Sequence, residues 1–135
     1  MSDGRIEISR SDKIIVWCDA HNGIIEHQML KPTYGEALHT ALLAGVKAMA
    51  QYKASKWLSD DRNNTALPPE HLEWADTVWG PMAIAAGWKH WALIQPKLMV
   101  GKMNMGRVIK IYADRGVTVQ VFDEPEAARA WLKSV

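Results

Sequence analysis

The stretch that decides the fold is KWLSDDRNNT, residues 56–65, in which a short apolar run ends at two aspartates, an arginine and two asparagines (60–64). The segment SKWLS (55–59) predicts a short buried strand, and the polar residues predict the loop at its carboxyl end. In open α/β sheets, ligands bind at that end of the strands. Three interpretations of the loop stay open: an active site, a phosphoacceptor loop, or only the turn that closes the strand.

The residues before this stretch predict three strands and one helix. RIEISR (5–10) alternates apolar and polar side chains, KIIVWCD (13–19) is a denser β-branched run, and IIEHQML (24–30) follows the turn signal HNG (21–23). We therefore expect an antiparallel meander. Apolar residues at helical spacing then predict a helix over 33–53, capped by Thr33 and Glu36.

The residues after it alternate helices with strands. A helix is predicted from Pro69 to Gly87, with an interruption at Gly80-Pro81 because Pro81 has no amide hydrogen to donate. Asp123 and Glu126 predict a capping box for the last helix. The remaining predicted elements are a strand at 90–96, a helix at 97–114, a strand at 117–122 and a helix at 123–134. The order predicts an α/β fold in which the later strands run parallel.

The composition is typical of a globular protein, with 135 residues, 48% hydrophobic and 23% charged, which fits one domain over 1–135. A net charge of +1 does not favour capture of nucleic acid or an anionic membrane. The single cysteine, Cys18, excludes an internal disulfide and is expected to be buried and inert. No secretory signal or apolar run of bilayer length is visible, so we expect a cytoplasmic protein without a membrane span.

The polar loop holds the main candidate binding residues, Asp60, Asp61, Arg62 and Asn63. Two carboxylates and a guanidinium are suited to a metal, a phosphate or a polar ligand. The alternative is that Asp60 and Arg62 pair with each other and anchor the turn. The five histidines show no metal-ligand spacing, and no nucleophile–base pair lies beside the loop, so we predict no metal and no cofactor.

Trp74 is the other candidate binding residue. It lies five residues before Trp79, so on an α-helix the two indoles point roughly 140° apart. Trp79 follows the apolar stripe of the helix, and Trp74 is expected to point away from it. We therefore place Trp74 at a dimer interface or at the rim of a pocket.

Four segments together carry a family resemblance that covers nearly the whole chain: KWLSDDR (56–62), PPEHLEW (68–74), AAGWKHWALIQP (85–96) and VQVFDEPEAARAWL (119–132). The chain resembles the STAS-like (anti-sigma-factor-antagonist-like, STAS/SEC14) domains of bacteria, many of which have no assigned activity. The resemblance implies a four- or five-stranded mixed sheet with helices packed largely on one side. Together with the order of elements above, we expect a single domain with a mixed sheet of four to six strands, an antiparallel N-terminal meander and about four helices.

The resemblance also bears on the polar loop. In anti-sigma antagonists of this family, a serine in the loop after the central strand is phosphorylated by a partner kinase. Asn63 and Asn64 stand where that serine is expected, and Thr65 is the nearby hydroxyl. Because two acidic side chains in the loop would repel a phosphate, the anti-sigma role is not carried over.

The sequence therefore leads to one main functional hypothesis and two rivals. The main hypothesis is a non-enzymatic, regulatory STAS-like domain that forms a homodimer and binds a partner protein or a small, partly apolar ligand. The first rival is a phospho-regulated switch with Thr65 as the candidate phosphoacceptor. The second rival is an enzyme that uses the Asp60, Asp61 and Arg62 cluster.

Overall fold

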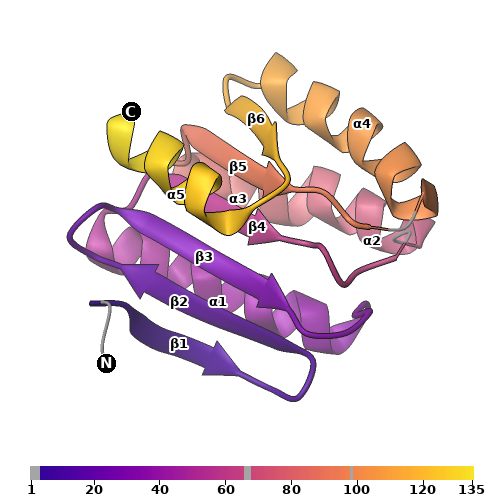
Figure 1. Ribbon diagram of the computed structural model, residues 1–135, viewed down its shortest axis with the longest axis horizontal. Coiled ribbons are helices and arrows are strands. Elements are labelled where there is room, and N and C mark those ends of the chain that lie inside the picture. The colour runs from indigo at the N-terminus through magenta and orange to yellow at the C-terminus, as the bar shows by residue number, and fades with distance from the viewer. Residues whose placement is uncertain (1–3, 66–67, 98) are drawn as a thin grey trace.

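The fold is built on a six-stranded mixed sheet whose strands stand in chain order, β1 to β6 (Figure 1). The structure, a computed structural model, describes residues 4–65, 68–97 and 99–135, and the description leaves out the side chains of 99–105 and 108. The strands are β1 (Ile6–Arg10), β2 (Ile14–Asp19), β3 (Ile24–Met29), β4 (Lys56–Asp60), β5 (His90–Ile94) and β6 (Thr118–Phe122).

The sheet changes direction in its middle. β1, β2 and β3 pair antiparallel as a meander, as predicted. From β3 onward the pairs β3–β4, β4–β5 and β5–β6 are parallel, because a helical segment carries the chain back before each new strand. β4 therefore lies inside the sheet, with its carboxyl end beside those of β3 and β5.

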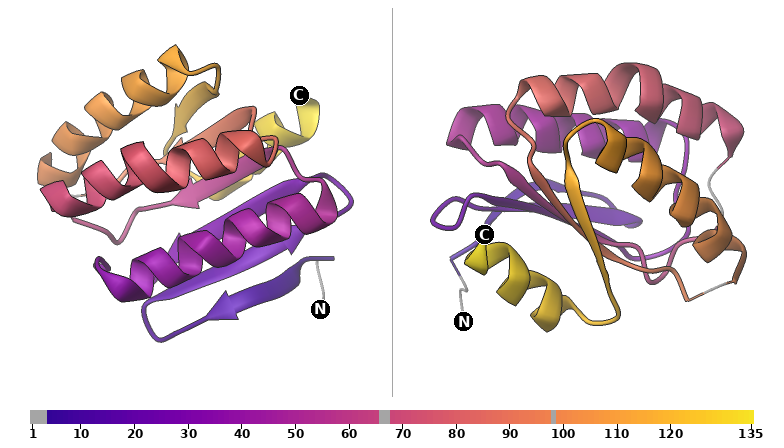
Figure 2. Two further views of the ribbon diagram at one scale, coloured as in Figure 1. Left: turned by 180° about the vertical axis from the view of Figure 1, so that it is seen from behind. Right: turned by 90° about the horizontal axis from the view of Figure 1, so that it is seen from above.

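The helices form two unequal layers (Figure 2). Helix α1 (Glu36–Tyr52), the continuous segment of α2 (Pro69–Trp74), η1 (Ala75–Trp79) and α3 (Gly80–Ala85), and helix α4 (Met99–Asp114) lie on one face. Helix α5 (Pro125–Ser134) lies alone on the other. The α/β class and the mixed sheet with helices largely on one side are thus confirmed.

The core has one apolar cluster on each face of the sheet. The cluster under α1 contains Trp57, Trp79, Trp88 and Trp91, each at most 7% exposed. The cluster under α5 joins β-strand residues such as Leu58 to residues of α5. Cys18 is buried in the first cluster, as expected, and burial raises the pKa of its thiol.

Both predicted capping boxes are wrong. Helix α1 begins at Glu36 after Gly35, and the Thr33 hydroxyl donates to the Lys31 carbonyl at 2.7 Å instead. Helix α5 begins at Pro125 with no side-chain cap. Proline in the first turn needs no amide partner, so a cap is less necessary there.

Across the described residues, no helix combines the length and the apolar character that crossing a bilayer would require.

Candidate functional site

The polar loop after β4 is divided between the two faces of the sheet. Successive residues of a strand point to opposite faces, so the side chains of Trp57, Ser59 and Asp61 face the α1 layer. Asp60 faces the α5 layer, where it binds Arg62. The polar residues 60–64 therefore do not form one cluster.

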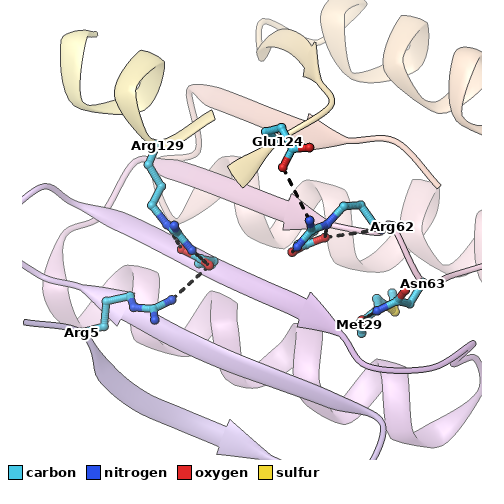
Figure 3. Close-up of polar contacts among 8 residues, drawn as sticks. Arg5, Met29, Arg62, Asn63, Glu124 and Arg129 are labelled. Carbon is cyan, nitrogen blue, oxygen red and sulfur yellow. Dashed lines mark hydrogen bonds and ion pairs between the residues drawn. The ribbon is translucent and has the colours of Figure 1, made fainter. Parts of the chain in front are cut away.

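Asp60 and Arg62 form a bidentate ion pair with each other, which is the alternative to a ligand-binding role for these two residues. Arg62 Nε and Nη2 donate to the two Asp60 carboxylate oxygens at 2.9 and 2.8 Å. Glu124, at the start of α5, lies 3.9 Å from Arg62 Nη1 (Figure 3). The hydrogen bond to Asp60 raises the pKa of Arg62. The Asp60–Arg62 pair closes the turn after β4, and the longer Arg62–Glu124 contact reaches the residue just before α5.

The asparagines of the loop fasten it to the end of β3 and the residues after it. Asn63 Nδ2 donates to the Met29 carbonyl at 3.2 Å (Figure 3), and the Asn64 side-chain oxygen accepts from the Thr33 amide at 3.3 Å. Asn64 is buried, with 2% exposed. Thr65 is half-buried at the end of this stretch. These contacts account for the polar residues 62–64 as parts of a closed turn.

Asp61 instead borders a cavity of about 380 Å³ between the sheet and helices α1, α2 and α4. This volume is in the range of small-molecule pockets. The walls are mainly apolar: Leu38 and Leu42 from α1, Trp57 and Trp91 from the sheet, Trp79 from η1 and Tyr112 from α4.

The floor of the cavity carries a buried hydrogen-bonded chain. The Trp57 indole N–H donates to His27 Nδ1 at 3.0 Å, and His27 Nε2 lies 2.7 Å from Asp61 Oδ1. An indole nitrogen only donates, so Nδ1 must accept, and we assign the single imidazole proton to Nε2, which donates to Asp61. His27 is therefore a neutral ring whose two nitrogens are both engaged.

Ser59 extends the polar floor toward β5. Its hydroxyl oxygen accepts a hydrogen bond from the Trp91 indole N–H at 2.8 Å. Ser59 and His27 occupy paired positions of β4 and β3, which explains why both reach the same floor.

His71 forms the polar part of the opposite wall. It belongs to α2, is 6% exposed and lines the cavity. Its Nδ1 is buried without a hydrogen-bond partner among the described residues. Burial, together with the nearby His39, lowers the pKa of His71 to about 4, so the ring is neutral at physiological pH.

Trp74 lies beside this wall and not in it. Its indole stacks on His39 of α1, with ring centroids 3.8 Å apart and planes 11° apart. The expectation that Trp74 points away from the core is wrong, because residues 75–79 form a π-turn instead of an α-helix. The wider turn lets Trp74 and Trp79 both face α1, where Trp79 donates to the Leu42 carbonyl at 2.9 Å.

The π-turn is held by helix α4 and by the residue that follows it. The Tyr112 hydroxyl donates to the Ala75 carbonyl at 2.9 Å, and Arg115 pairs with Asp76. Burial raises the pKa of Tyr112 to about 12, so the phenol stays a donor. The interruption predicted at Gly80-Pro81 therefore takes the form of a π-turn just before it, and π-turns occur frequently at functional sites.

Asp61 was predicted at the site from the sequence, whereas His27, His71 and the aromatic walls were not. Strand alternation gave a usable signal, since Ile25, His27 and Met29 share one face of β3. Among the described residues, no group of three or more His, Cys, Asp or Glu side chains is placed to hold a metal ion.

Comparison of the chain with protein-family models, with curated proteins and with solved structures gave no match. The STAS-like resemblance therefore stays a prediction.

Proposed function

We propose that this domain is a non-enzymatic binding module that takes a small, partly apolar ligand into the cavity beneath α1, α2 and α4. The observation that carries the proposal is the combination of apolar walls with a buried polar floor in a cavity of about 380 Å³. Ligand sites typically combine apolar walls with a few polar groups that fix orientation.

The His27–Asp61 pair supports binding over catalysis. A histidine oriented by a carboxylate is the arrangement of a general base, which needs its other nitrogen open toward the substrate. Here Trp57 occupies Nδ1 and Asp61 occupies Nε2. Neither nitrogen is open to take a proton from a substrate.

The two rival functions stay predictions. A phosphorylated switch requires a modified hydroxyl, and a phosphosite map of the protein from its native cells tests Thr65. An enzyme built on Asp60, Asp61 and Arg62 is less favoured, because Asp61 and the Asp60–Arg62 pair face opposite sides of the sheet.

The predicted homodimer and protein partner also stay proposals. Val78 and Met82, one turn apart on the η1–α3 segment, are 42% and 44% exposed and are the apolar side chains most suited to a contact there. Native mass spectrometry of the purified protein gives the subunit number and any retained ligand together.

The ligand proposal is tested by titrating octan-1-ol and hexan-1-ol into the protein by calorimetry. Saturable one-to-one binding is expected, and octan-1-ol should bind roughly fifteenfold tighter, since each buried methylene contributes about 0.8 kcal/mol. Ala75→Phe places a phenyl ring at the cavity and should weaken binding at least about tenfold.

Ala85→Phe is the matched control, because Ala85 lies on the same helical segment but is exposed and does not line the cavity. It should bind both alcohols as the wild type does. Equal binding by the two phenylalanine variants, or no saturable binding at all, would contradict the proposal.

A further inference from the structure

The burial and hydrogen-bond partners of Asp61 indicate which polar group a ligand of the cavity carries. This side chain is 7% exposed, and its Oδ1 accepts the His27 Nε2–H at 2.7 Å. Because the Trp57 hydrogen bond keeps His27 Nδ1 unprotonated, His27 supplies a hydrogen bond to the carboxylate but no positive charge.

No described lysine or arginine lies within ion-pair distance of Asp61. Buried carboxylates are normally paired with a cation, because desolvation of an isolated charge is costly. Asp61 Oδ2 has no hydrogen-bond partner among the described residues, although the side chain borders the cavity. The Asp61 carboxylate thus lacks the cationic partner that normally accompanies a buried carboxylate.

The other titratable groups lining the described part of the cavity do not supply that charge. His71 is neutral, and neither of its ring nitrogens bonds to a described residue. Three carboxylates, Asp61, Glu73 and Asp76, face one guanidinium, Arg107, which is exposed. Asp76 is already paired with Arg115, the residue that follows α4, and this leaves the cavity negative at its floor.

We propose that the cavity selects an apolar ligand with a protonated amine, whose ammonium group donates to Asp61 Oδ2 and to His71. The inference rests on the proposed function and adds the chemical class: an alkyl- or arylalkylammonium compound. An ammonium group has three donors and supplies the missing positive charge. The indoles of Trp79 and Trp91 line the cavity, and aromatic rings also favour cations.

The test compares three ligands with the same chain and different polar ends: octan-1-amine, octan-1-ol and octanoate, titrated by calorimetry at pH 7.5. The amine should bind at least about tenfold tighter than the alcohol, since a charged hydrogen bond contributes more than a neutral one. Octanoate should bind most weakly. Asp61→Asn, which keeps an oxygen for His27, should abolish the preference for the amine over the alcohol.

The control is Asp123→Asn, which removes the same charge from an exposed residue on the α5 side. It should keep the preference for the amine. If Asp61→Asn does not fold, the alternative measurement is the chemical shift of the Trp57 indole N–H in the wild type as each ligand is added. That proton is coupled to Asp61 through His27, so it should shift more with the amine than with the alcohol.

Each outcome has a distinct meaning. If octan-1-ol binds but the amine binds no tighter, or if octanoate binds best, the amine proposal is wrong and the proposed function stands. A preference for the amine that persists in Asp61→Asn would contradict the proposal that Asp61 binds the ammonium group. A Trp57 resonance that shifts equally with the amine and the alcohol would contradict it as well. If none of the three ligands saturates the protein, both proposals fail.

Discussion

At the scale of single residues, Gly45 shows how closely α1 approaches the sheet. A Cβ at this position would lie 2.2 Å from Cη2 of Trp57, the indole that bonds His27. Only glycine therefore allows the Trp57 ring to lie under the helix. The same contact positions the floor of the cavity, because Trp57 fixes the His27 tautomer.

Gly45→Ala should destabilise the protein by about 1–3 kcal/mol in urea unfolding, since the rigid indole must move. Gly106→Ala is the matched control, because Gly106 lies in α4 and a Cβ there has nothing within 4 Å. The control should gain about 0.5–1 kcal/mol from helix propensity. Equal effects from the two substitutions would show that Gly45 is not needed for packing.

His71 makes stability depend on pH. The ring takes up a proton with a pKa of 6.5 in the unfolded chain and about 4 in the folded chain, because it is buried. Between these values the unfolded state holds more protons, so the free energy of unfolding falls as the pH drops from about 6.5 to 4 and levels off below. The full effect is at most about 3 kcal/mol.

Urea unfolding at pH 7.5 and pH 4.5 measures this loss in the wild type and in His71→Gln. The variant should lose clearly less free energy of unfolding between the two pH values, whereas the control His21→Gln, at an exposed turn residue, should follow the wild type. An equal loss in wild type and His71→Gln would contradict the assigned burial.

At the scale of elements, α5 is fastened to the sheet by a buried carboxylate. Arg129 Nε and Nη2 donate to the two Glu26 oxygens at 3.1 and 2.7 Å, and Arg5 donates to the same carboxylate at 3.1 Å (Figure 3). The Glu26 side chain is 6% exposed. This contact joins two segments that lie 103 residues apart in the chain.

Arg129→Met should destabilise the protein by about 1–3 kcal/mol, less than the loss of a sole partner, because Arg5 still compensates Glu26. Lys133→Met, at an exposed position of the same helix, should change stability by no more than about 0.5 kcal/mol. Denaturant unfolding of both variants is the measurement. A loss at position 129 no greater than at 133 would mean that α5 is held by its apolar face alone.

The elements were predictable to different degrees. The strands and amphipathic helices follow from apolar periodicity, which depends on neighbouring residues only. The π-turn at Ala75–Trp79 was not predictable as such, because Tyr112 and Arg115, which bond it, lie far along the chain. The Thr33 capping box failed for a different reason: the Thr33 hydroxyl bonds the Lys31 carbonyl of the preceding turn instead of the helix.

At the scale of the whole molecule, the order of elements allowed the mixed sheet to be predicted, since helical crossovers require parallel strands. It did not allow the cavity to be predicted. The cavity depends on where α1, α2 and α4 lie relative to one another, and Asp61, His27 and His71 come from three separate elements. The alternation of side chains along β4 predicts that Asp60 and Asp61 point to opposite faces of the sheet. Only the pairing of β3 with β4, however, brings His27 next to Asp61.

The central claim is that the cavity under α1 binds a small apolar ligand, and the seven tryptophans provide a direct test of it. The measurement is the set of indole N–H resonances in a ¹⁵N–¹H spectrum as octan-1-ol is added. Trp57, Trp79 and Trp91 line the cavity and should shift together along one saturating curve. Trp17, which contacts Arg5, and Trp131 of α5 should not move. Shifts confined to Trp17 or Trp131, or the absence of any saturable shift, would contradict the account.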